Sequence, residues 1–389
     1  MDEHRFTRKQ EISFLLMVSL FWFAQYIYIP YQTTYLTLGG VSSSFTGIVV
    51  GAYGVSQLIL RFPVGLCADF AGRHKRFLMA GTFFAGLASV FRIFGGNGMG
   101  FLVANLFSGT ASAMWISFMV FYTGHYGEDE QQTATSRIVL FNNLGMLLGF
   151  LTSTLTYNRI GMEGICFLSV CAGLAAFLLS LQVKEKGKPT VAKKKSDLLV
   201  CSTRRLWFFS FLALIQQGIQ LTTAMSFTNQ ILKDLGGSDG LLGVSSVVYM
   251  LSAVCFAAFA SKGGCKRKGS GFWIPTVFVV GAVYCVLVPF VKQLPVLLLL
   301  QLLPGMSTGI LFSYLTSEAM YGVMEQCKAT AMGIFQAVYA IGMTLFPVLT
   351  GMLVLRAGTR TAYIILAGFS LFGWAVSLKY YKDEKTLRE

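Results

Sequence analysis

The fold is decided by one short charged segment between two long apolar stretches: Gly65-Leu66-Cys67-Ala68-Asp69-Phe70-Ala71-Gly72-Arg73-His74-Lys75-Arg76. This segment holds one carboxylate, two glycines and a tight basic cluster, whereas the flanking stretches are too apolar for a soluble protein to expose. Two apolar spans joined by a basic turn are typical of a transmembrane hairpin whose turn faces the cytoplasm. The segment therefore predicts an integral membrane protein.

The composition of the whole chain agrees with this prediction. Its 389 residues are 54% hydrophobic and 12% charged, and the mean hydropathy is +0.63. A soluble domain carries about 25% charged residues. The net charge of +14 would suggest nucleic-acid binding in a soluble protein. Because the basic residues here lie between apolar stretches, we interpret them as topology signals that also attract anionic lipid.

Apolar segments long enough to cross a bilayer recur along the entire chain. They must be helices, because lipid offers no partner to backbone groups and the alternation of a barrel strand is absent. The fold class we predict is an all-α membrane protein with twelve transmembrane helices. The predicted spans are Ile12–Leu36, Ser44–Leu66, Phe77–Phe94, Met99–Tyr122, Thr135–Tyr157, Gly164–Val183, Leu206–Leu232, Leu241–Ala260, Phe272–Val291, Leu294–Met320, Ala329–Leu355 and Thr361–Tyr380.

Basic residues orient the predicted helices. Most Lys and Arg residues fall in the terminal segments and the even-numbered loops. The segments expected on the outside hold only five: Arg159, Lys233, Lys292, Arg356 and Arg360. This bias predicts an uncleaved first span, with both termini in the cytoplasm and the protein in the cell membrane.

The chain divides into two halves of similar sequence. Residues 184–205 are lysine-rich and predict a cytoplasmic linker between two six-helix bundles, residues 1–183 and 206–389. Gln131-Gln132-Thr133-Ala134-Thr135 recurs as Gln326-Cys327-Lys328-Ala329-Thr330, at an offset of about 195 residues. Internal repetition in a polytopic protein is typical of transporters with a solute site at the repeat interface.

The spacing of the opening segment resembles the signature loop Gly-x-x-x-Asp-x-x-Gly-Arg-x-Lys/Arg of the major facilitator superfamily, placed between the second and third spans as in that family. The resemblance implies two pseudo-symmetric six-helix bundles, transport by alternating access, and a gating role for the loop, with Asp69 facing the start of the eleventh helix near Ala329. The alternative is a topogenic turn with a solvated Asp. The expected gating residues are Gly65, Asp69, Gly72, Arg73, Lys75 and Arg76.

Polar residues within the spans are the candidates for contact with the solute, since they are costly where they face lipid. Most lie on the helices that the resemblance implies as cavity-lining. Each could instead be interhelical glue. Their amide, hydroxyl and aromatic chemistry suits a neutral polyol or an amphipathic aromatic compound better than a small anion. The candidates are Trp22, Gln25, Tyr26, Tyr53, Gln57, Asn105, Trp115, Asn142, Gln216, Gln220, Tyr314, Gln336 and Tyr339.

Charged residues inside the predicted spans are further candidates. Glu318 is a candidate coupling residue, as a proton carrier or cation partner, or else forms a gate salt bridge with a basic loop residue such as Lys328. Arg61 is expected to snorkel inward or to pair with Asp69 or Glu318. We expect Arg92, near the outer end of the third span, to reach the lipid headgroups.

Several functions are disfavoured by the residues. The eight cysteines form no Cys-x-x-Cys pair, so we expect neither a disulfide nor a metal site. There is no phosphate-binding loop and no clustered catalytic group, so neither an ATP-driven pump nor an enzyme is expected, and no cofactor. Proton antiporters of the resembling family carry an Arg where this chain has Asn105. These antiporters also carry a Gly-Pro pair in the fifth helix, where this chain has Gly145 and Gly149 but no proline.

The leading interpretation is a monomeric secondary transporter that moves a small organic solute, with protons as a possible coupling ion. Efflux of a drug-like or metabolic compound is favoured by the compact loops and aromatic residues. Uptake of a neutral sugar, nucleoside or similar polar solute is the alternative, favoured by the amide-rich stripes. A non-transporting sensor on a carrier fold is a more remote alternative.

Overall fold

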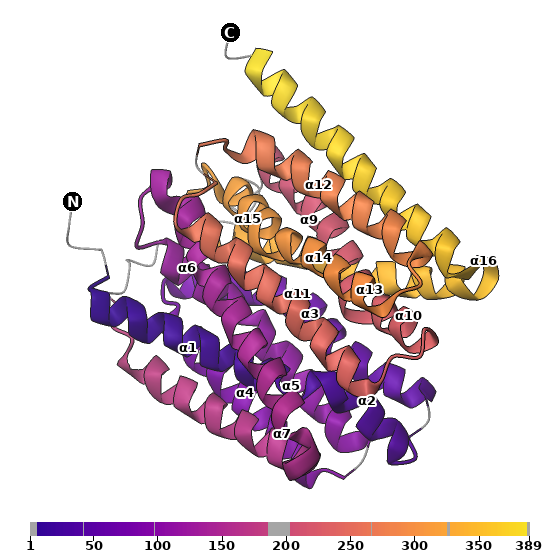
Figure 1. The fold of residues 1–389 in the computed structure, drawn as a ribbon. Helices are drawn as coiled ribbons and strands as arrows, with labels where there is room; N and C mark the ends of the chain where they lie inside the picture. The colour runs from indigo at the N-terminus through magenta and orange to yellow at the C-terminus, as the bar shows by residue number, and fades with distance from the viewer. Residues whose placement is uncertain are drawn as a thin grey trace. The chain divides into compact units, whose positions relative to one another are not determined.

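The structure is a computed structural model that describes residues 6–41, 43–96, 98–185, 203–265, 267–324 and 327–386. Throughout these ranges the regular elements are helices (Figure 1). The long elements are α1 (Arg8–Tyr26), α2 (Ile29–Leu38), α3 (Ser43–Ala71), α4 (Lys75–Phe94), α5 (Met99–Ala113), α6 (Trp115–Thr123), α7 (Gln131–Gln182), α9 (Arg204–Thr222), α10 (Thr228–Asp234), α11 (Asp239–Ser261), α12 (Ser270–Leu287), α13 (Leu294–Leu300), α14 (Leu302–Met306), α15 (Phe312–Met320) and α16 (Lys328–Thr386). Most of the predicted linker, residues 186–202, lies outside the described residues.

The described helices match the predicted spans closely. Within the described ranges, nine stretches are long and apolar enough to cross a membrane, and one of them, Gln131–Gln182, contains two predicted spans. The second and seventh predicted spans coincide with α3 and with α9 through α10. The two longest helices, α7 and α16, each bend at a glycine with positive φ, Gly161 (φ +65°) and Gly358 (φ +83°), so each comprises two predicted spans. Only glycine adopts this backbone geometry readily, and it sits at a predicted external turn in both cases.

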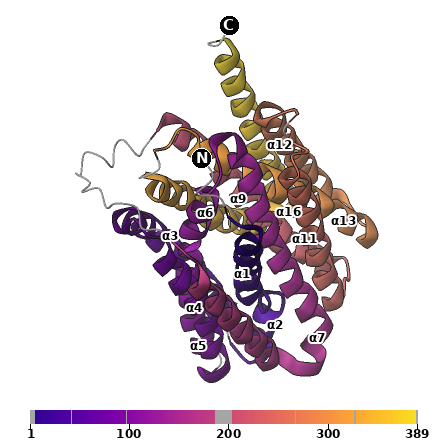
Figure 2. The same ribbon diagram turned by 90° about the vertical axis from the view of Figure 1, so that its left-hand side faces the viewer.

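The chain forms two compact units. The first comprises residues 1–134, 141–203 and 322–337, and it therefore includes the beginning of α16. Within it α5 packs against both α3 and α4, and Figure 2 shows α4 and α5 side by side. Small residues allow this packing, since a Cβ on Gly109 of α5 would lie 2.5 Å from the Tyr53 carbonyl oxygen of α3. Gly145 also packs closely, against the backbone of Ser19.

The second unit comprises residues 135–140, 204–321 and 338–389. Its α11 packs against α14, and a Cβ on Gly305 would lie 2.4 Å from the Ser252 hydroxyl oxygen. Two helices of this unit contain a π-helical turn, η2 (Thr223–Phe227) after α9 and η4 (Ser307–Leu311) after α14. Such wide turns are rare and frequently mark functional sites.

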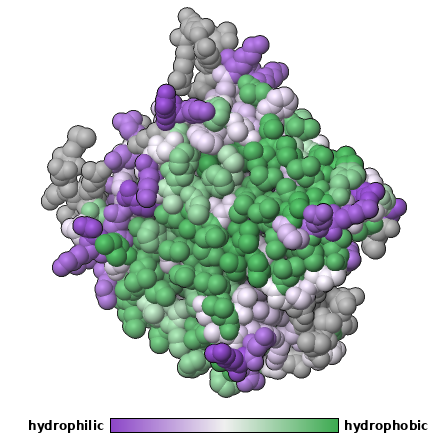
Figure 3. All heavy atoms as spheres, in the orientation of Figure 1, coloured by the Kyte–Doolittle hydropathy of each residue, from purple (hydrophilic) through white to green (hydrophobic). Residues whose placement is uncertain are grey.

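The exterior suits a lipid environment. Hydrophobic residues form most of the molecular face in Figure 3. Large apolar side chains are strongly exposed on both units, among them Phe94 (82%), Leu155 (68%) and Leu299 (64%). In water such a surface would aggregate, whereas in a bilayer it costs nothing.

The prediction that the chain has no disulfide is wrong. Cys327 is disulfide-bonded, whereas the other described cysteines, Cys67, Cys166, Cys171, Cys255, Cys265 and Cys285, are free. Disulfide formation requires two Cα atoms within about 7 Å, and this proximity is decided by tertiary structure rather than by sequence spacing.

Candidate functional site

The Asp69 carboxylate lies at the N-terminus of α16, within the first unit. Oδ1 accepts a hydrogen bond from the backbone N–H of Ala329 (3.1 Å) and Oδ2 accepts one from that of Thr330 (2.7 Å). The Thr330 hydroxyl also donates to Oδ2. A carboxylate at this position satisfies helix N–H groups that have no partner within the helix, and it interacts favourably with the positive end of the helix dipole. The contact predicted between Asp69 and the region of Ala329 is therefore present.

Two further residues of α3 contact the same part of α16. Gly65 lies about one helical turn before Asp69, and Arg61 lies about one turn before Gly65. A Cβ on Gly65 would lie 2.4 Å from the Ala329 carbonyl oxygen, so only glycine allows this approach. Arg61 donates from Nη1 to the Gln336 carbonyl oxygen (3.0 Å) and from Nη2 to the Gln57 side-chain oxygen. Its side chain is 4% exposed, so the snorkelling alternative for Arg61 is wrong, whereas its pairing with Asp69 or Glu318 stays a prediction. Arg61, Gly65 and Asp69 together form what we call the α3–α16 contact.

The basic end of the opening segment begins the next helix. A second carboxylate, Glu185, accepts hydrogen bonds from the backbone N–H groups of His74 (2.6 Å) and Lys75 (2.9 Å) at the start of α4. The Lys75 ammonium donates to the Leu181 carbonyl oxygen (2.8 Å). Gly72 has φ +58° in the turn before α4. The side chains of Arg73 and Arg76 are exposed.

A polar network in the first unit joins three of the predicted solute residues. The Gln25 side-chain amide donates to the Ser108 carbonyl oxygen (3.0 Å) and to the Ser112 hydroxyl (3.3 Å), and the Tyr53 hydroxyl lies 2.8 Å from the same Ser112 oxygen. Asn105, one turn before Ser108, donates to the Val49 carbonyl oxygen (2.7 Å). The side-chain amide oxygen of Gln25 (Oε1) is buried without a hydrogen-bond partner.

Arg92 also belongs to this network, and the prediction that it reaches the headgroups is wrong. Its side chain is 4% exposed. It donates at 2.9 Å to the hydroxyl oxygens of Ser89 and Ser108 and to the side-chain oxygen of Asn105. Its guanidinium carbon lies 3.4 Å from the centroid of the Tyr28 ring. Planar guanidinium groups stack on aromatic rings and make several fixed hydrogen bonds, so packing holds this cation inside the bundle.

Aromatic side chains border the same unit. Trp22 packs edge-to-face against both Tyr26 (5.5 Å between ring centroids) and Trp115 (5.2 Å). The Trp22 indole N–H is buried without a hydrogen-bond partner. The sequence-predicted aromatic candidates of the first and fourth spans are thus brought together.

The second unit has its own chain of polar residues. The Gln216 amide donates to the Gln220 side-chain oxygen (2.5 Å) and to the Ser307 hydroxyl (3.0 Å), and Gln220 donates to the Tyr249 hydroxyl (2.6 Å). Gln216 and Gln220 line a cavity of about 20 Å³, which has room for one water-sized species. The i, i+4 spacing of these glutamines places them on one helix face.

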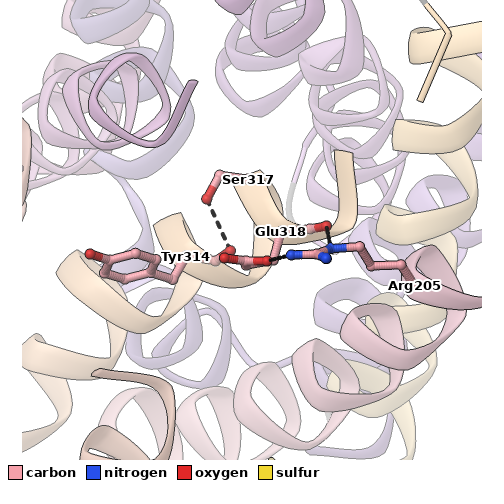
Figure 4. A network of polar contacts seen from close by, with 4 residues as sticks. All are labelled: Arg205, Tyr314, Ser317 and Glu318. Carbon is pink, nitrogen blue, oxygen red and sulfur yellow. Dashed lines mark hydrogen bonds and ion pairs between the residues drawn. The ribbon is translucent and has the colours of Figure 1, made fainter. Parts of the chain in front are cut away.

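Glu318 forms an ion pair with Arg205, the second residue of α9, as Figure 4 shows. Arg205 Nε also donates to the Glu318 backbone carbonyl oxygen (3.1 Å), and its guanidinium lies over the Tyr321 ring (4.8 Å). The salt-bridge alternative for Glu318 is therefore observed, with Arg205 rather than Lys328 as the described partner. The sequence offered Lys328 only as an example of a basic loop residue, and tertiary packing brings α9 to the end of α15.

The side chains of four further candidates have other surroundings. Tyr314 is directed to the loop after α11, where its hydroxyl donates to the Cys265 carbonyl oxygen (3.1 Å). Tyr339 packs edge-to-face on Phe312. Asn142 and Gln336 are buried, and their side-chain oxygens have no hydrogen-bond partner. Across the described ranges, no group of His, Cys, Asp and Glu side chains is arranged to hold a metal ion.

Comparison with known proteins decides the family. The sequence profile of the Major Facilitator Superfamily matches residues 14–323. The chain belongs to the major facilitator superfamily. It is 23% identical over 358 residues to an uncharacterized MFS-type transporter, MJ1560, of Methanocaldococcus jannaschii, covering 88% of this chain and 90% of that protein. It is 21% identical over 182 residues to the inner membrane transport protein YajR of Escherichia coli, covering 46% and 40% of the two chains.

Solved structures of the superfamily share the fold. The Escherichia coli fucose:proton symporter FucP matches with a TM-score of 0.76 at 15% identity, covering 95% of this chain and 98% of that one. The human organic anion transporter MFSD10 matches with a TM-score of 0.72 at 17% identity and the same coverage. This major facilitator is therefore a multi-pass membrane protein and a secondary transporter, not an enzyme.

Sequence reasoning missed the roles of two polar residues in this major facilitator. Arg92 follows Ser89, Ala85 and Thr82 on one helical stripe of small residues, and that stripe indicates a buried face. Glu185 is a lone acid at the edge of the basic linker, with no signal of its role as a helix cap.

Proposed function

We propose that this chain exports a small organic solute, drug-like or metabolic, by alternating access. The observation that supports alternating access is the α3–α16 contact, because it joins residues 260 apart through a few hydrogen bonds to one carboxylate. A contact of this kind is strong enough to hold one conformational state and weak enough to be broken during a transport cycle. Asp69 is then the central gating residue, and Gly65 provides the close approach that it needs.

The solute-contacting residues in this proposal come from the polar groups of the two units. Gln25, Tyr53, Trp22 and Tyr26 in the first unit, with Gln216 and Gln220 in the second, offer amide, hydroxyl and aromatic surfaces. A solute with uncharged polar groups and an aromatic or apolar body matches this chemistry. The buried Trp22 N–H and Gln25 carbonyl oxygen are groups that a solute could satisfy after a conformational change.

Uptake is the second candidate. FucP is a fucose:proton symporter by name, and the amide-rich residues of this chain also suit a polar solute. In the state described, Glu318 is ion-paired with Arg205, so a role in carrying a proton would require this pair to break. MFSD10 is named as an organic anion transporter, so anionic compounds belong in any solute screen.

The first experiment identifies the solute. Purified protein is screened for thermal stabilisation by a library of neutral, cationic and anionic compounds, because a ligand of the folded state raises the melting temperature. Compounds that stabilise are then tested for flux in proteoliposomes with pH gradients of either sign. Export coupled to inward proton movement supports the proposal. Flux that ignores the proton gradient excludes proton-driven export, and stabilisation without flux favours a sensor.

The second experiment tests the gating role. Asp69→Asn keeps the shape of the side chain but loses the charge that interacts with the α16 N-terminus, so we expect transport to fall about tenfold, equivalent to about 1.4 kcal/mol. Membrane insertion and yield should be unchanged. Asp129→Asn, at an exposed site, is the matched control and should retain activity. Normal turnover in Asp69→Asn would remove Asp69 from the mechanism.

A further inference from the structure

Arg92 is a buried cation without a counter-ion among the described residues. Its side chain is 4% exposed, and its hydrogen bonds go to neutral oxygens, those of Ser89, Asn105 and Ser108. No described Asp or Glu side chain is buried to the same extent. Because a buried charge is costly unless an opposite charge is near, an unpaired cation inside a membrane-spanning bundle indicates a functional role.

The surroundings of Arg92 leave both its charge and one of its donors available. The Ser89 hydroxyl donates to Ser169 Oγ (2.7 Å), which in turn donates to the Ala24 carbonyl oxygen (2.6 Å). Ser89 therefore offers only lone pairs to the guanidinium, as suits a group that is always protonated. The Nε–H of Arg92 is buried without a hydrogen-bond partner. An anion could use this donor and neutralise the charge.

Arg92 also lies beside a solute contact of the proposed function. Ser108 accepts from Arg92 through its hydroxyl (2.9 Å) and from the Gln25 side chain through its backbone carbonyl (3.0 Å). The ring of Tyr28 covers the guanidinium, with 3.4 Å between the guanidinium carbon and the ring centroid. Tyr28 belongs to the short break between α1 and α2, and residues at the ends of helices are those that absorb backbone movement. A movement of Tyr28 would open Arg92 to a solute that contacts Gln25.

We propose that Arg92 determines the charge of the solute, which is an organic anion with a carboxylate group and an aromatic or apolar body. The inference rests on the proposed function, since that function places the solute against Gln25. Opposite charges attract strongly where water is excluded, and a guanidinium pairs with a carboxylate through charge-assisted hydrogen bonds. The same charge repels a cationic solute. The uncharged side chains alone suit a neutral compound, and the buried charge of Arg92 adds the requirement for an anion.

The test uses three fluorescent probes that share one aromatic body and differ in charge. At pH 7 dansylglycine is an anion, dansylamide is neutral and dansylcadaverine is a cation. Each is titrated into purified protein in detergent, below the melting temperature of every variant, and protein-free micelles give the background. Wild-type protein should bind dansylglycine at least about tenfold more tightly than dansylamide, a difference of about 1.4 kcal/mol. It should bind dansylcadaverine more weakly than either.

Two variants separate the charge of Arg92 from its packing. Arg92→Gln keeps a hydrogen-bond donor and removes the charge, so the three probes should bind with similar affinity. Arg92→Lys keeps the charge and should still prefer dansylglycine, whereas a purely structural role would weaken the binding of all three probes alike. Arg159→Gln is the matched control, because it removes an exposed arginine of the same unit, and it should keep the wild-type preference.

Wild-type protein that binds the three probes equally, or binds none of them saturably, would overturn the proposal. The full preference for dansylglycine in Arg92→Gln would also overturn it. If Arg92→Gln does not fold, Arg92→Lys decides, because loss of the preference in a variant that keeps the charge would equally contradict the proposal. Failure of the proposed function is a different result: dansylglycine binding that depends on Arg92, without export from proteoliposomes, would contradict export and leave the selection of anions in place.

Discussion

Arg92 lies near the end of a predicted span, where an exposed side chain is expected, but it is buried among protein side chains. A charged side chain in a membrane span is costly unless it reaches water or finds partners. Arg92 finds neutral partners, in Ser89, Asn105, Ser108 and the Tyr28 ring, so its charge is stabilised by dipoles and by an aromatic face. The chain thereby carries a buried cation next to Asn105, where related antiporters have an arginine on the fourth helix itself.

Arg92→Lys should destabilise the protein although it keeps the charge. Lysine has no planar fork, so it cannot serve Ser89 and Asn105 from separate nitrogens while stacking on Tyr28. We expect a loss of about 1–3 kcal/mol, seen as a lower melting temperature of the purified protein. Arg76→Lys, on an exposed residue, is the control. Equal melting temperatures for wild type and Arg92→Lys would show that these contacts contribute little.

Cys265 should be unreactive at neutral pH. Burial in the loop after α11 raises the pKa of the Cys265 thiol to about 11, and the thiolate is the nucleophile. N-ethylmaleimide at pH 7 should therefore modify the exposed Cys67 and spare Cys265, with labelling of Cys265 increasing only as the pH rises toward 11. Peptide mass spectrometry reads out each site. Comparable modification of both residues at pH 7 would contradict the buried environment.

At the scale of elements, two helices begin on a carboxylate supplied by a distant part of the chain. Glu185 accepts from the first N–H groups of α4 and Asp69 accepts from those of α16. Each arrangement satisfies backbone donors that a helix leaves unpaired, and each depends on tertiary contact rather than on a local capping residue. The first backbone N–H groups of α4 and α16 are therefore satisfied only when a distant segment of the chain packs against them.

Gly65→Ala should disrupt the α3–α16 contact. The new Cβ would lie 2.4 Å from the Ala329 carbonyl oxygen, so α3 must move away from α16. Such overpacking costs about 1–3 kcal/mol, and we expect a lower melting temperature together with reduced transport. Gly51→Ala, in the same helix, meets nothing within 4 Å and should be tolerated. Similar behaviour of the two variants would mean that the close approach is not required.

At the scale of the whole molecule, the distribution of basic residues predicts the topology. Single cysteines at Lys193 and Lys266, which lie outside the described residues, should be labelled by a membrane-impermeant maleimide only from the cytoplasmic side. A cysteine at Lys292 should be labelled only from the opposite side. The measurement uses a cysteine-free background and intact versus permeabilised cells. Labelling of Lys193 and Lys266 from opposite sides would contradict an architecture of two repeated halves.

The sequence alone was sufficient for the class of protein, the family and one tertiary contact. Spans of about twenty apolar residues must be helical in lipid, so hydropathy gave the helices and basic residues gave an expected topology. The motif around Asp69 placed its carboxylate at the start of α16 because that spacing is tied to a specific arrangement in the superfamily. The polar stripe of Gln216 and Gln220 was also visible, since residues four apart share a helix face.

Tertiary structure decided which polar residues meet. Nothing in local spacing shows that Arg92 will reach Asn105, that Arg205 will pair with Glu318, or that Gln216 will face a small cavity beside two π-helical turns. A hydropathy pattern gives the radial position of a side chain on one helix, but not the rotation and axial offset of the neighbouring helix against it. Those offsets come from the packing of small residues such as Gly65 and Gly109, and they determine which hydrogen-bonding groups are brought into contact.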